Sequence, residues 1–544
     1  MSIAYGSRQP CDEAAAARER TIPCPERDKP WVLATAILGS SLAFIEGSVV
    51  NLALPALQSD LETTSLGVQW VVNAYLLMLG SFMLIGGSLG DRYGLRRIFM
   101  IGTAVFGLAA LVAAFAPSMP LLIAARLLQG IGGALLVPAS LALVGSHFEE
   151  HERGRAIGTW AGASALTTAL GPVLGGWLVD QWGWPAVFLL VVPLAGITLA
   201  ICWWRVPVSP VQDRERLDYP GALALVAALG LLIYGLVAPA SGIERMIILS
   251  LAALSGAAFL WREHRSRAPM LPLRLFRSPV FSGANAMTFL LYSALNGTLF
   301  FLPFNLIQVQ GYSATEAGAA FLPFSLIMGF GSTFAGDRIR KGNRRAYLTA
   351  GPIVAAAGFA ALAIPGADAA YVTGFLPGIL LIGIGMTLAV APLTTVVMSS
   401  VGADEAGLAS GVNNTAARVA GVIAIAALTA VAVSRFGDGL VSELEAQGVP
   451  APLIGNLEQR SSQLAELQAP RGAPAPVVAA VSGAVASAYV ATFRVLAIVC
   501  GALAALSGLV AWLSVPGGPS PGTDERHIPQ WRPASGRSGI ERSE

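Results

Sequence analysis

The sequence predicts an all-α integral membrane protein with fourteen transmembrane helices. Three observations support this fold class. Hydrophobic residues make up 55% of the 544 residues and charged residues only 12%, against roughly 25% charged residues in soluble domains. Apolar stretches of about 20 residues, the length that crosses ~30 Å of hydrocarbon, recur along the chain. Lys and Arg are concentrated in every second connection between these stretches.

The apolar stretches, taken in order, give the predicted spans. The mean hydropathy of the chain is +0.65, and its apolar residues gather in fourteen segments: 31–54, 70–90, 97–116, 121–146, 155–179, 185–204, 219–239, 243–261, 279–305, 314–335, 345–365, 371–398, 405–433 and 485–514. If the N-terminus is cytoplasmic, 27 of the 34 Lys and Arg residues lie inside and four outside. This is the positive-inside distribution. We therefore expect a multi-pass protein of the plasma (inner) membrane with both termini cytoplasmic.

Two similar stretches divide the spans into halves. Residues 87–97 read GSLGDRYGLRR and residues 334–345 read FAGDRIRKGNRR. They close the second and the tenth span, and each begins an inside loop. Parallel repeats of six spans are a known transporter plan. The expected domains are therefore a six-helix half at 31–206, an inserted helix pair with cytoplasmic linkers at 207–278 and a second six-helix half at 279–514.

The remaining segments are polar. Residues 1–30 form the expected cytoplasmic, disordered head and lack the apolar core of a cleaved signal peptide. The tail at 515–544 is rich in Gly, Pro, Ser and Arg and is also predicted to be disordered. The loop at 434–484 is predicted to lie outside, and its Leu spacing allows short amphipathic helices, at Leu440, Leu444, Leu457, Leu464 and Leu467.

Glu46 is the only acidic residue predicted to lie deep in a span. A charge at the bilayer centre costs at least ~2.5–3.5 kcal/mol on insertion scales, so we expect this carboxylate to have a task. Arg126 in the fourth span lies at a similar predicted depth, because both residues are several positions from the outer end of their spans. The cation favours the ionised carboxylate and burial favours the neutral acid, so together they form a candidate proton switch. The alternative for Arg126 is a side chain that snorkels to the interface.

The stretch 87–97 is a candidate conformational latch. Its glycines allow a tight turn and close helix approach, and Asp91 at a helix end can pair with a cation or cap a neighbouring helix. The alternative is an ordinary inside loop with anchoring arginines. The latch residues, with their counterparts in the second half, are Gly87, Asp91, Arg92, Gly94, Arg96, Arg97, Asp337 and Arg338.

This stretch resembles the G-x-L-a-D-r-x-G-r-k signature of the major facilitator superfamily. Residues 121–138, LLIAARLLQGIGGALLVP, resemble the R-x-x-Q-G signature of its proton-coupled members. Span 1 ends with EGSVVNLALP, which is similar to the L-D-x-T-i-V-N-v-A-L-P signature of fourteen-helix drug:proton antiporters of the EmrB/QacA type. Glu46 stands where that signature has Asp. The segments 69–75 and 311–318 also resemble that family, so the resemblance covers about residues 30–515 and implies the major facilitator fold.

Span 5 resembles the superfamily's antiporter signature, G-x8-G-x3-G-P-x2-G-G, with Thr167 in place of the middle glycine. Proline permits a kink and glycines allow close packing. The alternative is a generic glycine-rich helix contact. The matching residues are Gly158, Gly171, Pro172, Gly175 and Gly176.

Several polar and aromatic residues at membrane depth are candidates for lining a substrate cavity, although helix–helix packing explains each alone equally well. They are Asn73, Tyr75, Gln129, Tyr292, Asn296 and Phe300. Arg418 and Arg494, the other two cations within spans, are interpreted as lipid-interface or interhelical residues.

These features predict a proton-coupled antiporter that exports hydrophobic or cationic small molecules by alternating access. The alternatives are a dedicated exporter of one endogenous metabolite, such as an antibiotic or amino-acid-like compound, an uptake symporter, and a non-transporting sensor. Catalytic and metal-ligand clusters and a GxxxxGK[ST] sequence are missing, so we expect neither an enzyme nor a cofactor, and the proton gradient as the driving force. The expected partners are lipid, protons and a small-molecule substrate. Nucleic acid is not expected, and a periplasmic adaptor stays open.

Overall fold

The computed structural model describes residues 26–148, 150–208, 218–237, 242–266, 269, 271, 273–339, 344–401, 406–470 and 472–517. Every regular element in this part of the chain is a helix, which confirms the predicted all-α fold class. Most of the predicted head and nearly all of the predicted tail lie outside the described residues. The same is true of residues 340–343 in the second repeated stretch.

The first half consists of α2 (Lys29–Asp60), α3 (Ser65–Tyr93), α4 (Leu95–Ala114), α5 (Met119–His147), α6 (Glu150–Trp182) and α7 (Pro185–Arg205). It is followed by α8 (Tyr219–Val237), α9 (Gly242–Arg265) and a 3-10 turn, η1 (Leu273–Arg277). The second half contains α10 (Pro279–Phe304), the π-helical η2 (Asn305–Val309), α11 (Ala314–Ala319), α12 (Leu322–Ile339), α13 (Arg344–Ala361), α14 (Tyr371–Gly374), α15 (Leu376–Ser399), α16 (Ala406–Ala446), α17 (Ala451–Gln459), the 3-10 helix η3 (Ser461–Glu466) and α18 (Ala475–Ser514).

Each of the fourteen predicted spans coincides with a helix, and two of them with a short helix followed by a longer one. Eleven helices among the described residues are long and apolar enough to cross a membrane. The helices are thus compatible with fourteen spans, and that count stays a prediction. Proline in the first turn marks the start of α2, α5, α7, α10, α15 and α18, where its missing N–H breaks no helical hydrogen bond.

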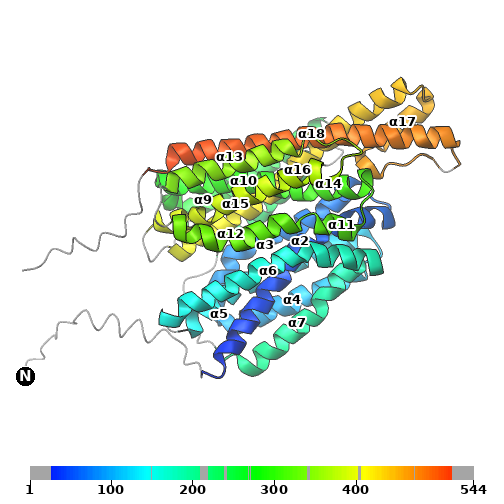
Figure 1. Ribbon diagram of the computed structural model, residues 1–544. Coiled ribbons are helices and arrows are strands. Elements are labelled where there is room, and N and C mark those ends of the chain that lie inside the picture. The colour runs from blue at the N-terminus through cyan, green and yellow to red at the C-terminus, as the bar shows by residue number, and fades with distance from the viewer. Residues whose placement is uncertain are drawn as a thin grey trace, which may run out of the picture.

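The two halves repeat one pattern of helix packing. In the first, α2 packs against α6 and α7, α4 packs against α5 and α7, and α3 packs against α5. In the second, α10 packs against α16 and α18, α13 packs against α15 and α18, and α12 packs against α15. These are the same five pairings when the helices are matched in chain order. In Figure 1 the first half, blue to teal, lies below the second half, green to red.

The contacts between the halves follow the same symmetry. The second helix of each half packs against the fifth helix of the other, so α3 contacts α16, and α11 and α12 contact α6. The inserted helices α8 and α9 pack against each other, and α8 also contacts α3 and α16. The insert therefore lies beside one of the two seams between the halves.

The described chain starts and finishes at one end of the bundle. Lys29 begins α2 and Ser514 ends α18 at this end, which we call the terminal end, whereas α17 marks the opposite end (Figure 1). The predicted loop at 434–484 is largely helical, because α16 and α18 extend into it. Its predicted amphipathic pattern is confirmed, since all five of its spaced leucines are buried: Leu440, Leu444, Leu457, Leu464 and Leu467.

Candidate functional site

Glu46 and Arg126 form an ion pair inside the first half. Arg126 Nη1 donates a hydrogen bond to Glu46 Oε1 at 2.6 Å. The side chains are 1% and 0% exposed for Arg126 and Glu46 respectively, so the contact predicted from depth is present. The snorkelling alternative for Arg126 is wrong, because the guanidinium is enclosed by protein. Removing one partner of such a pair leaves an uncompensated buried charge, at a cost of about 3–5 kcal/mol.

Three further contacts fix the Arg126 guanidinium. Its Nε donates to the Val71 carbonyl at 2.9 Å, and Nη1 also donates to Gln129 Oε1 at 2.7 Å. The guanidinium carbon lies 4.5 Å from the centre of the Tyr75 ring, which is cation–π distance. The Tyr75 hydroxyl donates to the Ala43 carbonyl in α2. Arg126 thus keeps partners in α3 and α5 even when the Glu46 carboxylate is neutral.

Some buried polar atoms around this pair have no hydrogen-bond partner in the described part of the chain. They are the second carboxylate oxygen of Glu46 and the amide nitrogen of Gln129. Unsatisfied buried polar groups are costly, and native proteins hold few of them. The cluster therefore has spare donors and acceptors next to an ionisable carboxylate.

Glycines in α5 bring the neighbouring helices close to this cluster. A Cβ at Gly130 would lie 2.5 Å from the Tyr75 carbonyl in α3, and one at Gly132 would lie 2.7 Å from the Phe106 amide in α4. The glycines of the sequence QGIGG therefore let the backbone of α5 approach both α3 and α4 closely. Its glutamine, Gln129, faces Arg126.

The glycines predicted to form an antiporter-type helix lie at two interfaces of α6. A Cβ at Gly175 would lie 2.4 Å from Val49 in α2, and one at Gly176 would lie 2.1 Å from the Ala314 carbonyl in α11. In return, a Cβ at Gly318 of α11 would lie 2.2 Å from the Pro172 carbonyl. The GP-x2-GG sequence therefore makes close contact with the second half as well as with α2. Gly171 is buried in the same helix, and Gly158 lies two turns from its start.

The stretch 87–97 forms the connection between α3 and α4. Gly94 is the single residue between these helices and has φ +94°, a backbone conformation that favours glycine. Arg96 donates to the Trp203 carbonyl at the end of α7, a contact within the first half. The Asp91, Asp337 and Arg338 side chains lie outside the described part of the structure, so their latch role stays a prediction.

A cavity of about 160 Å³ lies between the halves. Its lining residues come from α2, α6, α10 and α16 and from the turn before α12: Ala43, Phe44, Gly47, Asn51, Leu52, Pro172, Asn296, Leu299, Phe321 and Arg418. Asn296 alone among the six cavity candidates lines it. Tyr75 and Gln129 belong to the Arg126 cluster instead, and Asn73 is buried in α3. The Tyr292 backbone carbonyl accepts a hydrogen bond from the Asn296 side chain. Phe300 packs against Phe301 and Phe304.

Sequence reasoning missed the position of Arg418. The sequence favours the same interpretation for Arg418 as for Arg494, a lipid-interface or interhelical residue. Arg494 donates from α18 to the Ala363 carbonyl, just after the end of α13, but Arg418 lines the cavity. A signal was present, because a guanidinium in the middle of an apolar span needs a polar environment.

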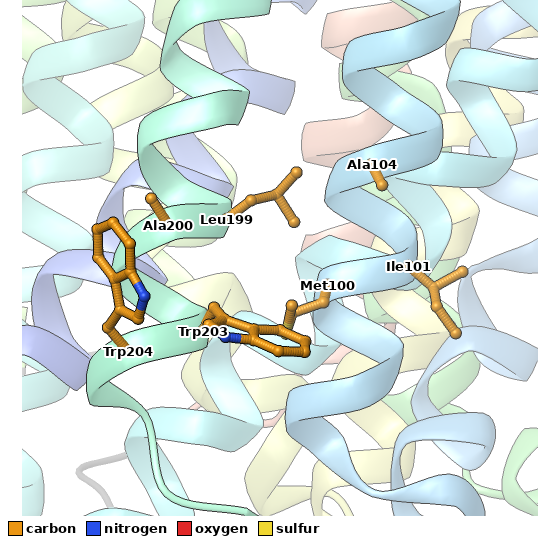
Figure 2. A pocket seen from close by; sticks show the side chains of 7 residues that line it. All are labelled: Met100, Ile101, Ala104, Leu199, Ala200, Trp203 and Trp204. Atoms are coloured by element: carbon orange, nitrogen blue, oxygen red, sulfur yellow. The ribbon is translucent and has the colours of Figure 1, made fainter.

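A second hollow lies on the outside of the bundle between α4 and α7. Figure 2 shows Trp203 and Trp204 of α7 beside it, with Met100 and Ile101 of α4 opposite. Both tryptophans are more than half exposed. Tryptophan at a span end next to an arginine is typical of the membrane interface, so this apolar groove faces lipid.

The chain matches the model of the Major Facilitator Superfamily over residues 36–425. It is 32% identical over 421 residues to the Multidrug resistance protein Stp of Mycobacterium tuberculosis (strain CDC 1551 / Oshkosh), covering 76% of this chain and 78% of that protein. It is 33% identical to the Tetracenomycin C resistance and export protein of Streptomyces glaucescens, with the same coverage.

A solved structure with the same fold is that of a bacterial homologue of the human lysosomal transporter Spinster, in an inward-facing, unoccupied conformation. The match has a TM-score of 0.59 at 16% identity and covers 91% of this chain and 100% of that chain. The repeated helix pairings, the close α6–α11 packing and the sequence match agree with one another. The chain is a membrane-embedded transporter and belongs to the major facilitator superfamily.

Proposed function

We propose that the chain is a proton-coupled antiporter that exports small, largely apolar molecules, drugs among them, from the cytoplasm. The observation that carries this proposal is the fully buried Glu46, paired with Arg126 at 2.6 Å. The two relatives described above are named for multidrug resistance and for antibiotic resistance and export. The 27-to-4 distribution of basic residues supports a cytoplasmic location for the terminal end.

Glu46 carries the proton in this proposal. In its ionised form it neutralises Arg126, and in its protonated form it releases Arg126 to the Val71 carbonyl and Gln129. The guanidinium keeps hydrogen-bond partners in both states, so the proton removes the charge partner of Arg126 and changes the α2–α5 contact while neutral groups still solvate the cation. A proton site of this kind lets the two charge states favour two arrangements of α2.

A short chain of contacts leads from Glu46 to the second half. Val49 lies one helical turn after Glu46 in α2 and packs against Gly175 of α6. The next residue, Gly176, packs against Ala314 of α11. A movement of α2 on protonation is therefore transmitted through α6 to the seam between the halves. Rocking of the halves then exposes the cavity between them first to one side and then to the other.

The test is substrate-driven proton movement in inverted membrane vesicles. Vesicles with the wild-type chain are energised to form a pH gradient, and release of that gradient is followed after addition of ethidium, chloramphenicol or nalidixate, one cation, one neutral molecule and one anion. We expect at least one of these to release the gradient, and Glu46→Gln to abolish the release for all of them. Equal release by wild type and Glu46→Gln would contradict the proton-carrier role.

A matched control is Glu445→Gln, which makes the same change at an exposed residue near the end of α16. We expect it to behave as wild type at equal protein level. The same panel addresses the alternative of a dedicated exporter, suggested by the relative named for tetracenomycin C. Failure of every compound to release the gradient would count against broad export.

A further inference from the structure

Arg418 places a positive charge in the cavity between the halves. It lies on α16, about 10 Å past Gly411, where the apolar part of this helix begins, and therefore well within the ~30 Å of hydrocarbon. Its Cβ packs 3.2 Å from the position that a Cβ on Gly80 of α3 would occupy. The backbone of α16 is thus held against the first half, and Arg418 lines the cavity beside that seam.

The protein supplies no counter-charge to Arg418 in the described residues. No ion pair or hydrogen bond joins its guanidinium to another side chain there, and none of the residues lining the cavity is acidic. Glu46 lies in α2 between the cavity-lining residues Ala43 and Gly47, but its carboxylate is bound to Arg126. α2 presents Ala43, Gly47 and Asn51, spaced four residues apart, to the cavity.

The remaining wall suits an organic molecule with one polar group. Phe44, Leu299 and Phe321 form apolar surfaces, and Asn51 and Asn296 supply amide groups. A guanidinium binds carboxylate and related planar anions through two parallel hydrogen bonds. A small number of polar groups, placed at defined positions in a mostly apolar pocket, is the usual basis of small-molecule specificity.

We propose that Arg418 is the substrate-binding cation of this transporter and that its preferred substrates are organic acids, exported as anions with an apolar body. This deepens the proposed export function and rests on it. The guanidinium binds the carboxylate of the substrate and the aromatic and aliphatic wall binds the apolar body, whereas Glu46 stays paired with Arg126 as the proton site. The proposal narrows the substrate class expected from the sequence, hydrophobic or cationic small molecules, to organic anions with an apolar body.

The experiment compares wild type with Arg418→Gln and Arg418→Lys in the same inverted vesicles. The probes are nalidixate and its uncharged ethyl ester, which share one apolar body, and ethidium as the cation. We expect wild type to transport nalidixate with a lower half-saturating concentration than the ester. Arg418→Gln should raise that concentration at least tenfold for nalidixate and less than threefold for the ester, and Arg418→Lys should restore part of the difference.

Arg494→Gln is the matched control, because it removes a guanidinium from a span outside the cavity. It should not change the ratio of the two half-saturating concentrations. The proposal is overturned if Arg418→Gln affects nalidixate and its ester equally, or if ethidium alone is transported. If the wild type transports none of the three probes, the export function itself is overturned. If Glu46→Gln transports the probes as the wild type does, only the proton coupling is overturned.

Discussion

The carboxylate of Asp180 in α6 accepts a hydrogen bond from the backbone amide of Thr315 in α11 at 2.7 Å. It also accepts one from the Ala314 amide at 3.0 Å. A side chain of the first half thus caps a helix of the second half at the end of the bundle opposite the termini. The start of α11 is itself fixed by a capping box between Ser313 and Glu316. This end of the seam is therefore closed in the structure.

Breaking the Asp180 contact should favour opening at this end. Asp180→Ala removes hydrogen bonds to a charged but partly solvent-exposed group, so we expect a shift of about 1 kcal/mol, or roughly fivefold, in the closed-to-open ratio. The measurement is a spin-label distance distribution between Gln181→Cys and Asp368→Cys in a background without native cysteines. Asp60→Ala, which removes an exposed carboxylate at the end of α2, should leave the distribution unchanged.

The same contact should not depend on pH above about 5. Burial acts to raise the pKa of Asp180, but the hydrogen bonds from Thr315 and Ala314 outweigh it and hold the pKa below its ordinary range. A lowered pKa means that the contact is fully present above the ordinary pKa and is lost only as pH falls through the lowered one. The spin-label distances should therefore be the same at pH 5.5 and pH 8. A shift toward opening at pH 5.5 would contradict this.

Enlarging Gly176 should block closure. A Cβ at this residue would lie 2.1 Å from the Ala314 carbonyl, and backbone atoms cannot give way as a flexible side chain does. We expect Gly176→Ala to reduce vesicle transport at least tenfold while the protein still inserts. The control is Gly196→Ala in α7, where a Cβ meets no atom within 4 Å. Equal activity of the two variants would show that the close α6–α11 approach is unnecessary.

The Glu46–Arg126 pair should show strong energetic coupling. Arg126→Gln leaves a buried carboxylate without its cation, so we expect a loss of about 3–5 kcal/mol in unfolding free energy. The double variant Glu46→Gln/Arg126→Gln removes both charges and should be more stable than Arg126→Gln alone. Reversible unfolding in detergent gives the unfolding free energies of the wild type, the two single variants and the double variant, which together form a double-mutant cycle. Additive effects would mean that the two residues do not interact.

Export of an anion should draw on the membrane potential more strongly than export of a neutral molecule. One proton exchanged for one monoanion moves two charges, and one proton exchanged for a neutral molecule moves one. At equal pH on both sides, a potential of about 60 mV supports a roughly hundredfold gradient in the first case and a roughly tenfold gradient in the second. Proteoliposomes with a potassium diffusion potential, tested with nalidixate and its ethyl ester, give the two ratios.

Much of this architecture could be predicted from the sequence, because the thickness of the bilayer sets the length of each apolar span and the orientation of the spans sets the distribution of basic residues among the loops. The apolar runs located the helices, and the depth of Glu46 and Arg126 predicted their contact. Gly94 was also predicted to allow a tight turn, and it does so through a positive φ.

The rest depends on which face of a helix points inward. Arg418 was not placed in the cavity, because an apolar helix has little periodicity and its rotation is set by packing against Gly80 of α3. Asp180 could not be identified because it lies just beyond its predicted span, and two of its three hydrogen-bond donors in α11 are backbone amides, which have no sequence signature. Contacts between the halves are long-range, and a linear sequence does not encode them locally.

η3 joins the two halves at the end of the bundle opposite the termini. η3 belongs to the second half, yet the carbonyls of Gln463 and Ser462 accept hydrogen bonds from Gln58 and Ser65 at the ends of α2 and α3. Each transport cycle that opens this end must detach η3 from the first half. Because this surface is expected to face the exterior, an antibody fragment that clamps η3 onto α2 and α3 would stop efflux without ever entering the cell.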